Sequence, residues 1–302
     1  MSDIDHKEIR LRVLVHGAVF LRLFVPLILL ILLTLGLFYA IIKWISEICE
    51  DFYMLIFYVR HGDPIYDPDK LTPLGERQAE AVARRLSLFG IDEIYASTSN
   101  RAIETARPTC ELTGLDFKTL DFLNENYLDG LKIAVSEKKR DWVWSHPDYA
   151  PLIASREVRE MGDLWYTHPK LEPYHFEKIL HPINEQLDAF IASLGYGHDT
   201  DSGTYKIAEG TNVEKRVAIF AHECMGKIFM SHLLDIPFPY YSAHFEMHTS
   251  AFSVLRIDNR GPNKNPRYEH ARAQVLTLSN DSHLYRDAMP LLHRYTNIRE
   301  RY

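Results

Sequence analysis

The sequence has few cysteines and no surplus of basic residues. Its three cysteines, Cys49, Cys110 and Cys224, are odd in number and far apart, which argues against a disulfide framework and against a thiolate metal site. The formal net charge is −7, and no basic stripe with interleaved aromatic residues is present, so nucleic-acid binding is not expected. The pair Gly195 and Gly197 lacks the third glycine of a dinucleotide fingerprint, so no nucleotide cofactor is expected.

One long apolar run lies near the N-terminus. Residues 23–42 carry no charged side chain and match the length that the hydrocarbon core of a bilayer requires, which predicts a transmembrane helix. No small-residue cleavage site follows, so an uncleaved anchor fits better than a secretory signal. Because Lys7, Arg10, Arg12 and Arg22 precede the run, the positive-inside rule places the short N-terminal tail in the cytoplasm.

Residues 1–53 are therefore predicted to be a cytoplasmic tail and membrane anchor, and residues 54–302 a separate folded domain across the membrane. This predicts a single-pass membrane protein. A second interpretation stays open: translation from Met54, where the first strand of the domain begins, would give a cytoplasmic protein and make residues 1–53 an upstream extension.

The folded domain begins with an apolar, aromatic stretch of strand length that ends in Arg60, His61 and Gly62. In open α/β sheets, ligands bind just beyond the carboxyl ends of the strands. Neutral imidazole is a competent nucleophile, and guanidinium matches the geometry of phosphate oxygens. The pair of side chains at this strand end therefore predicts attack on a phosphoryl group.

Strand and helix patterns alternate after this loop. Thr72 and Pro73 are the natural N-cap and first residue of a helix that continues to Gly90. Further strands are predicted at 91–97, 117–120, 215–221, 249–257 and 273–278, further helices at 101–112, 183–194 and 225–234, and a polar loop at 195–214. This alternation implies parallel pairing with right-handed crossovers. The predicted fold class is α/β with a mostly parallel sheet.

Five side chains lie just beyond predicted strand ends, and they can meet at one edge of such a sheet. They are Arg60, His61, Arg101, Glu125 and His222. His61 would attack phosphorus and form a phosphohistidine while a backbone carbonyl holds its other ring nitrogen as a donor.

The remaining four side chains have complementary uses in such a reaction. Arg60 and Arg101 would bind the nonbridging oxygens, and a protonated His222 would add a further donor. Glu125 would protonate the leaving alkoxide and then activate water, which requires a raised pKa in a partly dry pocket. The scheme requires neither a cofactor nor a metal ion. No metal site is predicted, because the histidine pair His244 and His248 lacks a third ligand.

Several stretches resemble the histidine phosphatase superfamily, the phosphoglycerate mutase-like group. They are FYVRHG (57–62), LTPLGERQA (71–79), YASTSNRAIETA (95–106), LNE (123–125) and VAIFAH (217–222). The resemblance implies a three-layer α/β/α sandwich, a phosphorylated His61, Glu125 as proton donor, and a phosphate pocket made by Arg60, Arg101 and His222.

The sequence also departs from the pattern of that family. Asp63 and Asp67 stand where many relatives carry small polar residues and an asparagine, and Glu223 and Cys224 replace the usual glycine after the second histidine. A carboxylate near an anionic ligand is unfavourable unless it points away or is protonated. These departures argue more strongly against phosphomutase activity than against phosphoryl transfer in general.

The sequence thus predicts that residues 54–302 form a metal-independent phosphatase acting on a small phosphomonoester. Two alternatives stay open: a phosphomutase of the same family, and a catalytically silent, membrane-tethered domain that binds phosphorylated ligands. Cys224 beside His222 is also a candidate thiolate nucleophile, although no asparagine or aspartate partner is identifiable. Residues 126–180, aromatic and without clear periodicity, are predicted to form a lid over the pocket.

Overall fold

The strand that leads to the predicted nucleophile His61 is one of the two central strands of the main sheet. This strand, β1, Tyr53–Arg60, pairs in parallel with β10 and antiparallel with β11. Its alternate side chains enter two different hydrophobic clusters, Ile56 and Tyr58 on one face and Phe57 and Val59 on the other. A strand that is buried on both faces needs a continuous apolar sequence. This explains why its sequence shows no polar alternation.

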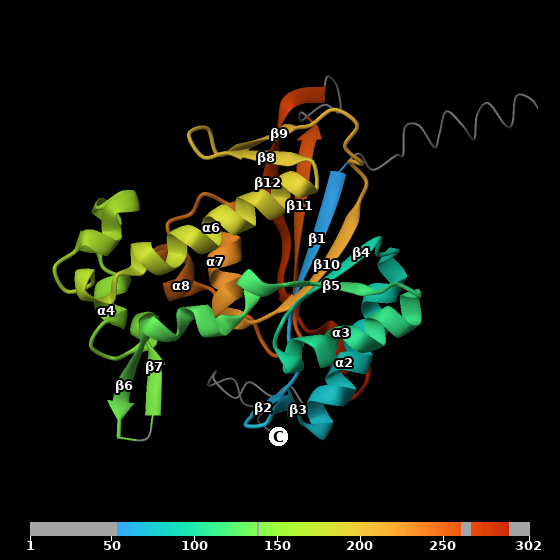
Figure 1. Ribbon diagram of the computed structural model, residues 1–302, viewed down its shortest axis with the longest axis horizontal. Helices are drawn as coiled ribbons and strands as arrows, with labels where there is room; N and C mark the ends of the chain where they lie inside the picture. The colour runs from blue at the N-terminus through green and yellow to red at the C-terminus, as the bar shows by residue number, and fades with distance from the viewer. Residues whose placement is uncertain (1–52, 138, 261–266, 290–302) are drawn as a thin grey trace, which may run out of the picture. The chain divides into compact units, whose positions relative to one another are not determined.

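The computed structural model describes residues 53–137, 139–260 and 267–289. Its main sheet has eight strands in the order β5-β4-β10-β1-β11-β12-β9-β8 (Figure 1). The other strands of this sheet are β4 Glu93–Ser97, β5 Phe117–Leu120, β8 Tyr196–Asp199, β9 Thr204–Ile207, β10 Arg216–Ala221, β11 Phe252–Arg260 and β12 Arg267–Asn280. Two small hairpins lie apart from it, β2 Pro64–Tyr66 with β3 Asp69–Leu71 and β6 Lys132–Ser136 with β7 Lys139–Trp142.

Helices cover both faces of the sheet, which confirms the α/β class (Figure 1). Helices α2, Pro73–Leu86, and α3, Asn100–Thr113, pack on the face that carries Phe57. Helices α6, Phe176–Ser193, and α7, Glu223–Leu233, pack on the face that carries Tyr58. The shorter helices are α4 Ala150–Ile153, α5 Arg156–Glu160, α8 Phe238–His244 and α9 Ser282–Arg286, with 3₁₀ turns at Ser87–Phe89, Asp121–Leu123, Glu125–Leu131, Val143–Ser145, Gly162–Thr167 and Glu172–Tyr174.

The sheet is mixed, so the prediction of a mostly parallel sheet needs correction. Strands β5, β4, β10 and β1 pair in parallel, as the strand and helix alternation predicts. Strands β11, β12, β9 and β8 continue the sheet with antiparallel pairing. Strands β8 and β9 are joined directly, as are β11 and β12, without a crossover helix, and antiparallel pairing is what such short connections allow.

The predicted polar loop at 195–214 is wrong, because it contains the edge hairpin of β8 and β9. Only Tyr196 and Tyr205 of these strands are buried, whereas His198, Asp199 and Lys206 are polar. An edge strand with one buried residue gives little alternation, which hides it from a pattern search.

The start of α2 is as predicted. Thr72 is the N-cap, and its hydroxyl oxygen accepts a hydrogen bond from the backbone N–H of Gly75 at 3.0 Å. The helix ends at Leu86, earlier than expected, and a 3₁₀ turn carries the chain to Gly90 in the left-handed conformation.

Residues 126–180 contain the β6–β7 hairpin and several single-turn helices. Their aromatic side chains are buried together with Phe238 of α8: the rings of Trp165 and Phe176 lie 4.7 Å apart, and those of Trp144 and Phe238 lie 5.1 Å apart. The segment is therefore packed into the same hydrophobic cluster as Ile56 and Tyr58 of β1. Its role as a lid stays a prediction.

The predicted transmembrane run at 23–42 lies outside the described residues. Within residues 53–137, 139–260 and 267–289, no helix has both the length and the apolar character needed to cross a bilayer.

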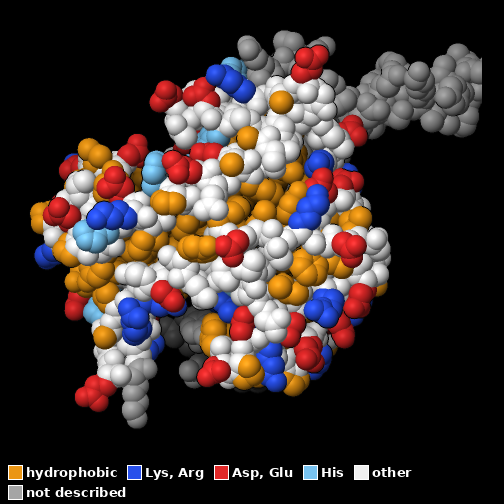
Figure 2. All heavy atoms as spheres, in the orientation of Figure 1, with side chains coloured by type: hydrophobic (Ala, Val, Ile, Leu, Met, Phe, Trp, Pro, Cys, Tyr) orange, Lys and Arg blue, Asp and Glu red, His pale blue; other side chains and the backbone are white. Residues whose placement is uncertain are grey.

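On the face shown in Figure 2, acidic and basic side chains are interspersed over the surface.

Candidate active site

His61 follows β1 directly, and hydrogen bonds on both sides hold its backbone. Its N–H donates to the carbonyl of Ala221 at 2.9 Å, and its carbonyl accepts from the N–H of Ser250 at 2.9 Å. The ring nitrogen Nδ1 lies 2.7 Å from the carbonyl oxygen of Gly62. A carbonyl can only accept, so Nδ1 carries the proton and Nε2 keeps its lone pair. The side chain is thus held as a neutral nucleophile.

Close backbone packing shapes the loop after His61. A Cβ atom on Gly62 would lie 2.7 Å from the carbonyl oxygen of Gly75, so only glycine permits this approach to the first turn of α2. Asp63 is buried, and its Oδ2 accepts a hydrogen bond from the Thr72 hydroxyl at 2.7 Å. Its carboxylate therefore engages the N-terminus of α2, where negative charge is favourable. Asp67 is exposed on the turn between β2 and β3.

His222 follows β10 at the N-cap position of α7, and its ring centroid lies 5.2 Å from that of His61. Its Nδ1 lies 3.0 Å from Nη2 of Arg101, and its Nε2 lies 2.9 Å from the hydroxyl of Ser97 and 3.2 Å from that of Ser99. A guanidinium can only donate, so Nδ1 is the acceptor and the proton resides on Nε2.

Both histidines are neutral in this arrangement. Burial, together with Arg60 and Arg101, holds the pKa of His61 well below its usual range. Burial, His61 and the two arginines do the same for the pKa of His222. The protonated His222 expected beside a bound phosphate is therefore not the form that this arrangement of groups stabilises.

Each arginine is paired with a carboxylate. Nη1 of Arg60 lies 2.6 Å from Oε2 of Glu223 and also donates to the carbonyl of Met247. Nη1 of Arg101 lies 2.8 Å from Oδ1 of Asp69, which the β2–β3 hairpin supplies. The Nε atoms of both arginines are buried without a hydrogen-bond partner among the described residues. Each guanidinium therefore keeps one N–H that is available to an anion.

Glu125 lies on the other side of Arg101. Its Oε2 is 3.8 Å from Nη2 of Arg101, and its Oε1 accepts from the N–H of Cys224 at 3.1 Å. Burial raises the pKa of Glu125, and this effect outweighs those of Arg101 and Arg60, which lower it. The side chain is thus able to hold a proton although two guanidinium groups lie nearby.

The structure brings together the five side chains that the sequence singled out, namely Arg60, His61, Arg101, Glu125 and His222. It also adds four that the sequence analysis did not assign to the site: Asp69, Ser97, Ser99 and Glu223. Ser97 is the last residue of β4 and Ser99 is the N-cap of α3, and these positions just before Arg101 are a signal that could have identified them. No comparable sequence signal identifies the carboxylates of Asp69 and Glu223, because their pairing with the arginines depends on the directions of the side chains.

The thiolate alternative at Cys224 is not supported. Its side chain is buried, and burial, Glu125 and Glu223 raise the pKa of the thiol well above its usual value. A protonated thiol is a weak nucleophile.

A family profile described as histidine phosphatase superfamily (branch 1) matches residues 56–161. The matched stretch contains Arg60, His61, Arg101 and Glu125, whereas His222 lies beyond it. The resemblance of the chain to this superfamily is thereby confirmed, and so is the predicted enzyme class, a phosphatase. Among curated proteins, no significant match is found.

Several solved structures of low identity align with most of this chain. A mycobacterial hydrolase is 18% identical, with 75% of this chain and 98% of that chain covered and a TM-score of 0.47. A mycobacterial glucosyl-3-phosphoglycerate phosphatase is 17% identical (75% and 99% covered, TM-score 0.45). A phosphoserine phosphatase from Entamoeba histolytica, in complex with 3-phosphoglyceric acid, is 14% identical (76% and 99% covered, TM-score 0.45). At these values the likeness carries no inference about substrate or mechanism.

The two rings are expected to have opposite tautomers. In ¹⁵N-labelled protein, nitrogen NMR should show His61 protonated on Nδ1 and His222 protonated on Nε2. Both rings should stay neutral as the pH falls through 6.5, the usual pKa of a histidine side chain. The His61→Ala and His222→Ala variants assign the signals. A proton on Nε2 of His61, or protonation of either ring at its usual pKa, would contradict this geometry.

Proposed function

We propose that this domain is a phosphomonoester hydrolase that transfers the phosphoryl group first to Nε2 of His61 and then to water. The observation that carries the proposal is the 2.7 Å contact between Nδ1 of His61 and the carbonyl of Gly62. It commits one ring nitrogen to donating and leaves the other as the only nucleophilic atom of the ring.

In the first step, the Nε2 lone pair attacks phosphorus and the bond from phosphorus to the leaving oxygen breaks. Glu125 gives its proton to that oxygen, so the product leaves as a neutral alcohol. In the second step, the Glu125 carboxylate takes a proton from water while the water oxygen attacks phosphorus. The phosphorus–Nε2 bond breaks, and both side chains return to their starting state.

The two arginines are proposed to stabilise the phosphoryl oxygens through their buried Nε–H groups. Their Nη1 atoms stay paired with Glu223 and Asp69, which hold each guanidinium in place. His222 accepts from Arg101 and so orients it. A protonated His222 would carry its second proton on Nδ1, so it could donate to a bound phosphate only after giving up the contact with Arg101.

His61→Ala should abolish turnover in a screen of many phosphomonoesters, because the neighbouring imidazole of His222 already uses its unprotonated Nδ1 to accept from Arg101. His181→Ala, at a histidine whose side chain is 71% exposed on α6, is the matched control and should retain activity.

Three outcomes of this screen would contradict the proposal. Activity that survives in His61→Ala would rule out a phosphohistidine intermediate at His61. Transfer of the phosphoryl group to a sugar or acid in preference to water would indicate a phosphomutase. Ligand binding by the unaltered chain without any turnover would indicate the silent binding domain.

Glu125→Gln should affect poor leaving groups most. We expect kcat/KM for an alkyl phosphate to fall by about 10²–10⁴-fold, and that for p-nitrophenyl phosphate to fall much less, because p-nitrophenolate leaves without a proton. Since burial raises the pKa of Glu125, the acid is present below that pKa, and kcat/KM for the alkyl phosphate should decline as the pH rises through it. The variant should lose this decline.

The control for this experiment is Glu185→Gln, at a carboxylate whose side chain is 68% exposed. It should leave the rate and the pH profile as they are. An equal loss for both leaving groups in Glu125→Gln would show that Glu125 does not act as the acid.

We further propose that residues 1–53 tether this domain to a membrane, as the uncharged run at 23–42 and the basic residues before it indicate. Mass spectrometry of the native protein should find the N-terminal residues attached, and the protein should stay in the membrane pellet after carbonate extraction. A native N-terminus at Met54 would overturn the tether and leave the catalytic proposal unaffected.

A further inference from the structure

A second cluster of titratable side chains lies apart from the phosphate pocket. Asp188 on α6, His198 on β8 and His232 on α7 each offer one ligand-type atom, and these atoms lie within 4.8 Å of one another. His232 comes ten residues after His222 along the chain. At about 1.5 Å of rise per helical residue, the cluster is about 15 Å from the active-site end of α7.

The distances within the cluster are close to those of a metal site. Oδ1 of Asp188 lies 2.9 Å from Nδ1 of His198 and 2.7 Å from Nε2 of His232. The two imidazole rings lie 5.0 Å apart at 87°. In a tetrahedral site with bonds of about 2.0–2.2 Å, ligand atoms are about 3.3–3.6 Å apart. The two Asp188 distances are shorter than this by about 0.4–0.9 Å, so the carboxylate and the rings would have to move apart by about that much to admit an ion.

The surroundings of His198 match those of a metal-binding histidine. Its Nε2 lies 3.2 Å from Oδ2 of Asp235, and its ring stacks on Tyr205 at 4.6 Å and 9°. Its side chain is only 1% exposed. A carboxylate that accepts from one ring nitrogen leaves the other nitrogen as a ligand and fixes the ring, which is the usual arrangement behind metal-bound histidine.

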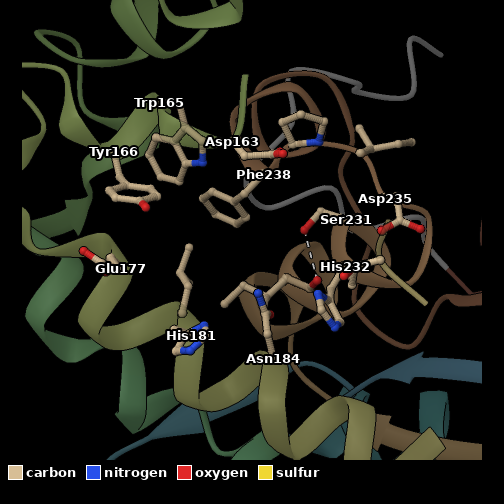
Figure 3. A pocket seen from close by; sticks show the side chains of 15 residues that line it. Asp163, Trp165, Tyr166, Glu177, His181, Asn184, Ser231, His232, Asp235 and Phe238 are labelled. Carbon is tan, nitrogen blue, oxygen red and sulfur yellow. Dashed lines mark hydrogen bonds between the residues drawn. The ribbon is translucent and has the colours of Figure 1, made fainter. Parts of the chain in front are cut away.

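The cluster also has access to solvent. His232 and Asp235 line a cavity of about 560 Å³, and Figure 3 shows both on its wall. Asn184, one helical turn before Asp188, lines the same cavity, and its Oδ1 is buried without a hydrogen-bond partner among the described residues. The side chain of Asp188 is 35% exposed. Three protein ligands with an open side toward a cavity leave room for a water or another small ligand.

We propose that Asp188, His198 and His232 bind one divalent transition-metal ion, with Asp235 as a positioning residue behind His198. Two imidazole nitrogens and one carboxylate oxygen suit zinc and its neighbours better than magnesium or calcium. The ion would connect α6 and β8, which follow one another along the chain, to α7. Without an ion, hydrogen bonds hold the same groups together, and the ion must displace the proton that lies between Asp188 and each ring.

In the test, a chelator first removes bound metal ions from the full chain, which is then titrated with zinc in equilibrium dialysis. We expect one zinc ion per chain, with affinity lowered at least tenfold in Asp188→Asn and in His232→Gln. Asp235→Asn should lower the affinity by about 10–100-fold while one ion still binds. The controls are His181→Ala, an exposed histidine on the same cavity, and His61→Ala, in the phosphate pocket, and both should bind zinc as the unaltered chain does.

X-ray absorption of the zinc-loaded, unaltered chain tests the ligands without any substitution. It should show two imidazole nitrogens with oxygen and no sulfur. Circular dichroism of the metal-free variants checks that they fold. Absence of stoichiometric zinc binding, a sulfur ligand, or a loss of zinc in His61→Ala would each overturn the proposal and leave a hydrogen-bonded network only.

Discussion

The arrangement of the active site depends on how the backbone around His61 is held. Its N–H and C=O are bound by Ala221 of β10 and by Ser250 before β11, so two neighbouring strands fix the position of one residue. The Gly62 carbonyl then fixes the ring. Because the parallel strand β10 also delivers His222, the distance between the two imidazoles follows from the pairing of β1 with β10. The pairing of the strands thus determines the relative positions of the two histidines in the site.

Burial is the dominant electrostatic effect in this site. It keeps His61 and His222 neutral and raises the pKa of Glu125 in spite of two adjacent arginines. The arginines do not form an unopposed cationic patch, because Glu223 and Asp69 are paired with them. The carboxylates of Glu223 and Asp69 reduce the net positive charge of the site and fix the two guanidinium groups. Binding of an anion therefore requires little reordering of the arginine side chains.

The sequence predicts much of this architecture because its signals are local. The strand that ends in Arg60 and His61, the Thr72 N-cap, and the crossovers to Arg101 and His222 are all visible in short stretches. The pairing of Arg60 with Glu223 and of Arg101 with Asp69 is not, because it depends on a short hairpin and on the first turn of α7. The β8–β9 hairpin carries too few buried residues to show alternation. The cluster of Asp188, His198 and His232 has no spacing motif, since its three members come from three separate elements.

The proposed chemistry makes one claim that a single measurement addresses. If Nδ1 of His61 is held as a donor by Gly62, phosphorus must bond to Nε2. Rapid quenching of the enzyme during turnover of a phosphomonoester, followed by phosphorus NMR and peptide mapping, should find phosphohistidine at His61 substituted on Nε2. Phosphate on Nδ1, on another residue, or on no residue at all during turnover would contradict the account.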